Sequence, residues 1–423
     1  MYHGIASEKM IVRLGQAGLI GFLGTGGWKP ERIENAIQTI QKQLTPSQPY
    51  GINLLSNLYL PELEEKNIEI YLRYGIKHIE AAGYIQLTSA IVHYRVKGLA
   101  LDESGKIVPQ NTIMAKISRP EVARLFMSPP PQPIVQKLLK DGKITQSQAR
   151  WSEKIPMADD ICVEADSGGH TDQGVAYVLM PAILYLREEM MQKFQYLYKI
   201  RVGAAGGIGT PEAAAAAFVL GADFILTGSI NQCTVEAGTS DAVKEILQNI
   251  QVQDTEYAPA GDMFELGAKV QVVKKGLFFP ARANKLYDLY RLHNSLEEIE
   301  EKTKEQLQSK YFHKSFEEIW QDVEKYYPEE ELRIARINPK RKMALIFRWY
   351  FGYATRLAMK GDAEHKVDYQ IFCGPSLGAF NQWVQKKPMA DWHNRHVDEI
   401  AELLMKNTAE LLNQRFQKIC EKA

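Results

Sequence analysis

Up to about residue 235, short apolar runs that end in glycine or a small polar residue alternate with stretches of helical character. Most of these runs are apolar at successive positions, unlike a strand that keeps one face in water. Seven runs follow this pattern, at residues 19–26, 50–56, 78–84, 112–118, 160–166, 201–207 and 224–230. Such runs are typical of buried parallel strands that helices connect.

Helix-length segments separate these runs, at residues 8–17, 30–43, 62–74, 120–127, 175–194 and 211–220. Pro30, Pro120 and Pro211 stand where a helix would begin, and proline is tolerated in the first helical turn. The alternation predicts an α/β fold, a TIM-type (β/α)8 barrel, which needs eight strands. Because only seven runs are present, we expect the first strand to lie before Met1, with residues 2–6 as the loop that leaves it. The alternative is an open sheet.

Two insertions interrupt this rhythm. Residues 97–111 are predicted to form a hairpin that turns at Glu103-Ser104-Gly105. Residues 128–156 contain a proline-rich turn and then a helical stretch with a break at Asp141-Gly142. We expect both insertions at the top of the barrel, the carboxyl-end face on which the active sites of this fold assemble.

Beyond residue 254 the pattern becomes mainly helical. Apolar residues recur at three- and four-residue steps in segments 292–309, 315–326, 328–336, 339–359 and 398–418. The expected organisation is therefore a barrel domain, 1–254, followed by a helical substrate or cap region, 255–423. The basic stretch Lys340-Arg341-Lys342 is either a contact for a phosphate or carrier protein, or the charged start of a helix with a buried face.

Composition narrows the functional classes. The 423 residues include 51 Lys plus Arg and 51 Asp plus Glu, so no excess positive charge favours nucleic-acid binding. The four cysteines have no metal-ligand spacing, and no run is long and apolar enough for a membrane span. The opening Met-Tyr-His-Gly is unlike a signal peptide. We expect a cytoplasmic protein without a metal site.

Two strand ends offer a place for an anion. Gly206 and Gly207 end one apolar run, and Gly228 with Ser229 ends the next. In barrels of this class the loops after the last two strands often form one phosphate cup. Backbone amides in such turns can point at the same anion. The alternative is that the glycines only allow close packing of strand and helix.

Polar side chains mark further strand ends. His170 follows two glycines after the run at 160–166, where an imidazole can act as an acid near neutral pH; the alternative is a hydrogen-bonded structural histidine. Asn53 offers both a donor and an acceptor to a heterocycle. Lys116 either carries a functional cation or forms a salt bridge to Glu80 or Glu164.

Longer motifs carry a resemblance to a known family. The segments GINLLS (51–56), EADSGGH (164–170), AAGGIGTPEAAAAAFVLGADF (204–224) and LTGS (226–229) resemble the 2-nitropropane dioxygenase-like flavoproteins, which are FMN-binding barrels. Segments 157–172, 228–240 and 372–384 resemble one branch more closely. That branch is the PfaD-type trans-acting enoyl reductases of polyketide and polyunsaturated-fatty-acid synthases.

The resemblance implies roles for individual residues. Its cofactor-binding positions match the following residues: Gly4, Ile5, Ala6, Asn53, Lys116, Ser167, Gly168, Gly206, Gly207, Gly228 and Ser229. Among them, Gly206, Gly207 and Gly228 would bind the FMN phosphate, and Lys116 would offset negative charge on the reduced flavin ring. His170 matches the histidine of the GGH motif and would be catalytic.

The resemblance also implies the reaction. An FMN-dependent enoyl reductase would use NADPH to reduce the 2,3 double bond of an enoyl thioester on an acyl carrier protein, and assembly as a homo-oligomer is compatible with that role. NADPH follows from the resemblance alone, because the sequence has no convincing nicotinamide-binding motif. Two alternatives stay open, a nitronate monooxygenase and a non-catalytic scaffold that docks carrier domains.

Overall fold

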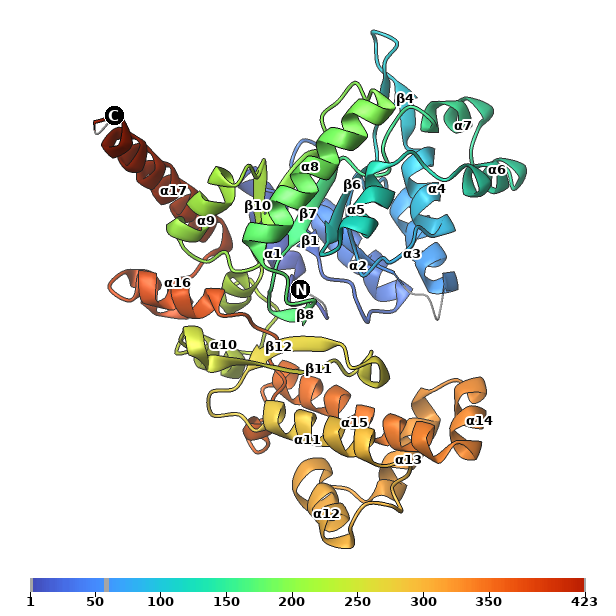
Figure 1. Ribbon diagram of the computed structural model, residues 1–423, viewed down its shortest axis with the longest axis vertical. Helices are drawn as coiled ribbons and strands as arrows, with labels where there is room; N and C mark the ends of the chain where they lie inside the picture. The colour runs from blue at the N-terminus through green and yellow to red at the C-terminus, as the bar shows by residue number, and fades with distance from the viewer. Residues whose placement is uncertain (1–2, 57–60, 422–423) are drawn as a thin grey trace. The chain divides into compact units, whose positions relative to one another are not determined.

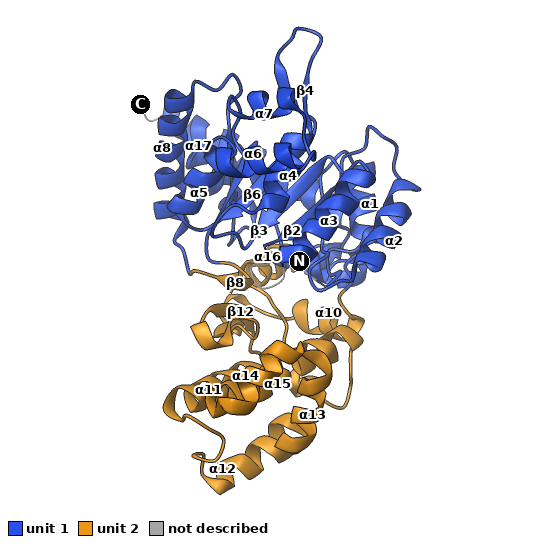
Figure 2. Ribbon diagram, turned by 90° about the vertical axis from the view of Figure 1, so that its right-hand side faces the viewer, with its two compact units in different colours: residues 1–166, 173–238, 387–423 blue, residues 167–172, 239–386 orange. Residues whose placement is uncertain are grey.

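The computed structural model describes residues 3–56 and 61–421 in two compact units (Figure 2). Unit 1 comprises Met1–Asp166, Gln173–Gly238 and Lys387–Ala423. Unit 2 comprises Ser167–Asp172 and Thr239–Lys386. This division differs from the predicted boundary at residue 254, because the last 37 residues return to the barrel unit and residues 239–254 belong to the helical one.

Unit 1 is built on a seven-stranded parallel sheet with the order β1-β2-β3-β6-β7-β9-β10 (Figure 1). Its strands are β1 (Phe22–Leu23), β2 (Gly51–Leu55), β3 (His78–Ala82), β6 (Thr112–Ile117), β7 (Asp160–Glu164), β9 (Arg201–Ala205) and β10 (Phe224–Leu226). Each predicted run contains one of these strands. The apolar runs form strands because both faces of the sheet are buried: helices cover the outer face, and side chains of the strands pack against one another on the inner face.

The sheet curls like part of a barrel. Phe22 on β1 and Phe224 on β10 belong to opposite ends of the strand order, yet both pack against the cluster of Met114, Cys162 and Ala205 in the central strands. Within the described residues β1 and β10 do not pair, so the sheet is an open half-barrel of seven strands. The predicted eighth strand, before Met1, lies outside the described residues.

Helices cover the outer face of this sheet. They are α1 (Glu8–Gln16), α2 (Pro30–Gln41), α3 (Pro61–Arg73), α4 (Ser89–Lys97), α5 (Pro120–Met127), α8 (Ala176–Phe194) and α9 (Pro211–Val219). Helix α17 (Val397–Cys420) packs against α9 and α1, and the unit also contains the short 3₁₀ turns η1 (Ser229–Cys233), η6 (Pro388–Ala390) and η7 (Trp392–Asn394). Pro30, Pro120 and Pro211 each occupy the first turn of a helix, as predicted. Helix α4 was not predicted from the sequence.

The two insertions form as predicted but on the other face. Hairpin β4 (Leu99–Leu101) and β5 (Ile107–Pro109) connects helix α4 to the start of β6, and α6 (Gln132–Lys140) with α7 (Gln146–Ser152) connects α5 to the start of β7. Connections from helix to strand reach the amino ends of the strands. The expectation that both insertions lie on the carboxyl-end face was therefore wrong.

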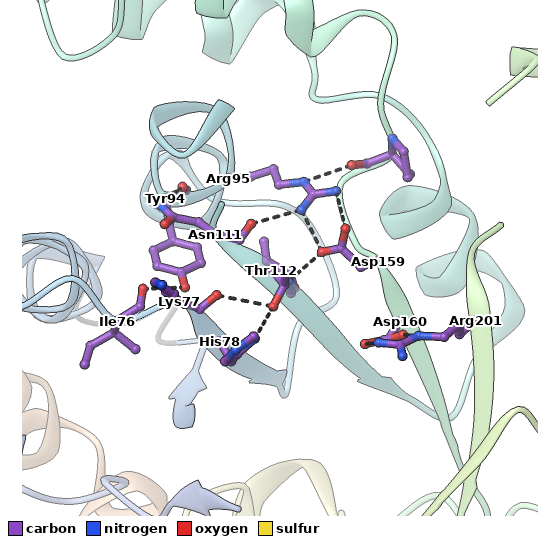
Figure 3. Close-up of polar contacts among 12 residues, drawn as sticks. Ile76, Lys77, His78, Tyr94, Arg95, Asn111, Thr112, Asp159, Asp160 and Arg201 are labelled. Atoms are coloured by element: carbon purple, nitrogen blue, oxygen red, sulfur yellow. Dashed lines mark hydrogen bonds and ion pairs between the residues drawn. The ribbon is translucent and has the colours of Figure 1, made fainter. Parts of the chain in front are cut away.

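A buried ion pair holds the amino ends of these strands together (Figure 3). The Arg95 guanidinium, 1% exposed, donates to Asp159 Oδ2 at 2.7 Å and Oδ1 at 3.0 Å. It also donates to the carbonyl oxygens of Asn111 and Pro156, which end the two insertions. Such a network serves stability, because catalytic groups of barrels lie at the opposite ends of the strands.

Unit 2 combines a small sheet with helices. Three antiparallel strands run in the order β11-β12-β8, with β8 (Gly169–Thr171), β11 (Thr255–Pro259) and β12 (Lys269–Val273). The helical elements are α10 (Asp241–Leu247), η2 (Val252–Asp254), η3 (Phe264–Leu266), α11 (Phe279–Leu292), α12 (Glu301–Gln306), the π-helix η4 (Leu307–Phe312), α13 (Phe316–Tyr326), α14 (Glu329–Ile337), α15 (Pro339–Lys360), η5 (Lys366–Asp368) and α16 (Ser376–Val384). The mainly helical character was predicted, whereas the sheet, α11 and α16 were not, and the helix expected from residue 292 begins at Glu301.

An aromatic and aliphatic core holds the helices of unit 2 together. Phe264, fully buried, contacts the rings of Tyr287, Phe347 and Phe351 from helices α11 and α15.

Throughout residues 3–56 and 61–421, every helix is too short or too polar to cross a lipid bilayer.

Candidate functional site

A row of polar side chains crosses four adjacent strands of unit 1, from the middle of β2 and β3 to the carboxyl ends of β6 and β7. Asn53 on β2 is the register partner of Glu80 on β3, and its Nδ2 donates to Glu80 Oε2 at 3.1 Å. Lys116 on β6 follows, with Nζ 3.4 Å from Glu80 Oε1 and 3.4 Å from Glu164 Oε1 on β7. The structure thus brings the predicted residues Asn53 and Lys116 together, with Glu80 between them.

Burial and pairing set the charges in this row. Burial alone would raise the pKa of Glu80, but the Lys116 ammonium and the Asn53 amide hold that pKa below its usual value. Burial opposes the charge on Lys116 too, yet Glu164 and Glu80 raise the pKa of this lysine. Burial, and then Glu164, raises the pKa of the Cys162 thiol far above normal. The row therefore holds a fixed cation between carboxylates and beside a neutral thiol.

The two sequence-based interpretations of Lys116, a salt bridge and a functional cation, are compatible with each other in this geometry. The predicted salt bridge exists, and it involves both candidate carboxylates rather than one. The Lys116 side chain nevertheless keeps 24% of its surface exposed. The cation is thus fixed in place by its partners and still partly exposed.

Two neighbouring strand ends form a glycine cradle. β9 and β10 are paired up to Ala205 and Leu226, so Gly206-Gly207 and Gly228-Ser229 follow side by side. Gly206 and Gly207 have φ of +87° and +73°, which places two successive residues in the left-handed region. A Cβ on Gly206 would lie 2.5 Å from the carbonyl oxygen of Ala165, so the turn closes only with glycine there.

The space beside the cradle suits an anion. A Cβ built on Gly207 or on Gly228 would meet no described atom within 4 Å. Helix α9 begins a few residues later, where Thr210 Oγ1 caps the amide of Ala213. Successive left-handed glycine amides and a helix N-terminus are both favourable surroundings for a phosphate group. This chemistry fits the phosphate-cup interpretation, and Gly206 in addition allows the close packing against Ala165.

The N-terminal segment lies beside the carboxyl end of β1. Gly4 donates its amide to the carbonyl of Gly24, and Gly24 donates to the carbonyl of Ala6. Ile5 is buried, and its carbonyl accepts a hydrogen bond from the amide of Gly238. The segment 4–6 is therefore fixed from two sides, at the carboxyl-end face where the sequence predicted it.

The remaining predicted residues, Ser167, Gly168 and His170, belong to unit 2. His170 lies on β8 opposite Val270 of β12, with its side chain 53% exposed. Its Nε2 donates to Asp262 Oδ1 at 2.8 Å. Desolvation opposes ionisation of Asp262, but the hydrogen bond from His170 holds the pKa of Asp262 below its usual value. The imidazole is thus oriented by a carboxylate and accessible to solvent.

Sequence reasoning missed Asp262 as the partner of His170, since 92 residues separate them and no local signal joins them. Glu164 was named only as one of two possible salt-bridge partners of Lys116. It begins the EADSGGH motif and is the last residue of β7.

The side chains of the basic stretch Lys340-Arg341-Lys342 contact other residues of unit 2. Lys340 Nζ donates to the carbonyls of Tyr290 and His293 at the end of α11. Arg341 pairs with Glu265 and Glu331, and Lys342 lies over the Trp320 ring. These contacts favour the helix-start interpretation over a contact for a phosphate or carrier protein.

Comparison with known proteins gives the family. Residues 1–274 match the family model described as nitronate monooxygenase. Residues 293–369 match a second model, described as the inserted helical domain of [acyl-carrier-protein] S-malonyltransferase. The chain is also similar to the polyketide biosynthesis protein PksE of Bacillus subtilis (58% identity, 99% of this chain, 55% of PksE) and to one component of the polyunsaturated fatty acid synthase of Thraustochytrium sp. (40% identity, 91% of this chain, 26% of that protein). It thus spans about half or less of these relatives.

One solved structure covers nearly the whole chain. The enoyl reductase domain of MlnA, from the macrolactin biosynthesis cluster of Bacillus amyloliquefaciens, is 48% identical with a TM-score of 0.96. The match covers 99% of this chain and 94% of that domain. By the family model, which covers more than half of its length, the chain belongs to the nitronate monooxygenase family of flavin-dependent oxidoreductases.

Proposed function

We propose that this protein is an FMN-dependent, trans-acting enoyl reductase. It would reduce the 2,3 double bond of enoyl thioesters on an acyl carrier protein in polyketide or polyunsaturated-fatty-acid biosynthesis, with NADPH as the reductant. The observation that carries this proposal is the similarity to the MlnA enoyl reductase domain, which extends through both units.

The residues of unit 1 fit the cofactor. The turn at Gly206-Gly207 and the open space at Gly228 would hold the FMN phosphate, with Ser229 beside them. The segment Gly4-Ile5-Ala6 and the row that contains Asn53 and Lys116 would line the flavin ring. When bound, FMN supplies hydride chemistry that no amino-acid side chain provides.

The polypeptide contributes orientation and charge. Lys116, held charged by its two carboxylates, would counter negative charge that builds up on the reduced ring. Ser167 and Gly168 lead directly into β8 and would present their backbone to the cofactor. His170, or a water that it holds, would protonate the α-carbon of the substrate after reduction of the β-carbon. Asp262 would fix the imidazole for that transfer.

Spectroscopy of the purified full-length chain tests the cofactor and the reductant together. We expect a yellow protein whose flavin absorbance bleaches on anaerobic addition of NADPH and returns when an enoyl-carrier substrate is added. A colourless protein that cannot be loaded with FMN but binds a carrier domain would instead support the scaffold alternative.

Substitutions at unit 2 test the proton donor. His170→Ala is expected to retain bound FMN and to lose most turnover, and Asp262→Asn to lose part of it, since general acid catalysis contributes roughly 10²- to 10⁴-fold. The double variant should be no slower than His170→Ala if both residues serve one proton transfer. Full turnover in His170→Ala would remove His170 from the mechanism.

The family model that matches residues 1–274 supports a second candidate, nitronate oxidation. That activity would appear as steady oxygen uptake with an alkyl nitronate and without NADPH oxidation. Comparison of kcat/KM for a nitronate and for an enoyl-carrier thioester, under equal FMN loading, separates the two candidates.

A further inference from the structure

The segment 4–6 depends on a loop more than 200 residues away in the sequence. Gly238 donates its amide to the Ile5 carbonyl at 3.0 Å, and Ser7 Oγ donates to the backbone carbonyl of Glu236 at 2.5 Å. A Cβ on Gly238 would overlap the carbonyl oxygen of Gly4, so the two backbones pass in direct contact. The loop 235–238 therefore sets where the segment 4–6 lies.

The side chain of Glu236 joins this loop to the C-terminal segment of unit 1. Its carboxylate is 8% exposed and accepts from His396 Nδ1 at 2.6 Å and from the Val397 amide at 3.2 Å. Arg13 Nε lies 3.5 Å away and also bonds Asp398 Oδ1 at 2.5 Å. A buried carboxylate is stable with such partners, because the Val397 amide opens the 24-residue helix α17 and Arg13 is a cation.

Further contacts make the junction firm. The Val235 amide donates to the Arg395 carbonyl at 2.9 Å, and the fully buried Arg395 guanidinium donates to the carbonyls of Met389 and Ala390. Apolar packing follows the same route: Ala6, Met10, Leu14, Ala237 and Val397 form one cluster. Residues 389–397 thus have little freedom to move without the loop 235–238.

We infer that Glu236 is a positioning residue for the cofactor, which couples the C-terminal segment 387–423 to the segment 4–6. The inference rests on the proposed function for one point only, that the segment 4–6 lines the flavin. Glu236 itself does not touch the reacting atoms. Its negative charge organises His396, the start of α17 and the loop 235–238, and this loop holds the backbone of residues 4–6.

The test is Glu236→Gln in the FMN-loaded full-length chain. Glutamine keeps the shape but loses the charge that pairs with His396 and Arg13, so the loop 235–238 is held less firmly and we expect FMN affinity to fall roughly tenfold or more. Release of FMN on dilution, followed by the recovery of flavin fluorescence, measures the dissociation constant without any substrate.

Asp160→Asn is the matched control. Asp160 is also a mostly buried carboxylate of unit 1 in an ion pair, with Arg201, but it begins strand β7 at the amino-end face. It should lower the free energy of unfolding to a similar extent while leaving FMN affinity unchanged. Equal loss of FMN affinity in the two variants, or none in Glu236→Gln, would overturn the positioning role.

Amide hydrogen exchange supplies a readout that general destabilisation would not mimic. In Glu236→Gln we expect faster exchange in both residues 3–7 and residues 397–408, and Asp160→Asn should leave both segments unchanged. Because FMN binding and exchange need no substrate, a protein that binds FMN but reduces no enoyl thioester would refute the proposed reaction alone. A wild-type chain that does not bind FMN would overturn both proposals.

Discussion

Lys116 on β6 and Glu80 on the adjacent strand β3 form an ion pair, with Nζ 3.4 Å from Oε1 and only 8% of the glutamate side chain exposed. A second carboxylate, Glu164, lies at the same distance on the other side of the lysine. Removal of a charge partner from a buried pair costs more than the pair itself contributes, because the remaining charge stays without compensation. Because of this asymmetry, single and double substitutions of these residues should differ measurably in folding stability.

Lys116→Met should lower the free energy of unfolding by about 2–3 kcal/mol, somewhat less than for a fully buried pair because the lysine is partly exposed. Urea unfolding at neutral pH measures the change. The double variant Lys116→Met with Glu80→Gln should recover part of the loss, since no carboxylate is then left buried without its cation at that position. Losses that simply add would show that the two residues are not coupled.

The same pair predicts a pH dependence with a definite sign. The pKa of Glu80 is lower in the folded chain than its value of about 4.3 in an unfolded one. Its contribution is therefore complete above that unfolded value and disappears as the pH falls through the lower, folded pKa. We expect wild type to be more stable than Glu80→Gln between pH 6 and 8, and the difference to shrink below about pH 4.3. Urea midpoints across this range test the prediction; a constant difference would contradict it.

Two substitutions in the glycine cradle distinguish a loss of space for the ligand from strain in the backbone. Gly228 has φ of −130° and open space where a Cβ would project, so Gly228→Ala should change the free energy of unfolding by less than about 0.5 kcal/mol. The added methyl group should nevertheless weaken FMN binding, because it occupies space that the proposed phosphate needs. Fluorescence titration measures that loss.

Gly206→Ala is the contrasting variant. Its positive φ and the 2.5 Å approach to Ala165 predict a loss of about 3 kcal/mol or more in folding stability, together with weaker FMN binding. If Gly228→Ala bound FMN as tightly as wild type, the phosphate would have to bind elsewhere.

The strands of unit 1 could be predicted from the sequence, because each is a short apolar run that ends in glycine or a small polar residue. The end of the strands at which the hairpin 99–109 lies could not be predicted from the sequence. Helix α4 (Ser89–Lys97) lacked a recognisable pattern since most of its residues are buried, and without it nothing shows that the hairpin enters a strand rather than leaves one.

The candidate site was predictable to the extent that its residues end strands. Lys116 and Gly206 lie at the ends of apolar runs and Asn53 lies within one, and the parallel sheet brings these strands together. Asp262 and Glu236 depend on contacts between distant segments, which no local pattern records. The strands β11 and β12 were missed because residues after 254 are mostly helical and these strands are short.

The amino-end network around Arg95 separates stability from catalysis (Figure 3). Asp159→Asn would leave the buried guanidinium with only neutral partners, the carbonyls of Asn111 and Pro156 among them, at a cost of about 3 kcal/mol. Asp159 Oδ2 also accepts the Ile113 amide at the start of β6, so the variant should unfold at lower urea concentration. Because reacting groups of barrels lie at the carboxyl ends of strands, kcat per bound flavin should stay within about twofold of wild type. A large fall in kcat with FMN fully bound would show that the amino-end face takes part in turnover, for which these contacts give no physical basis.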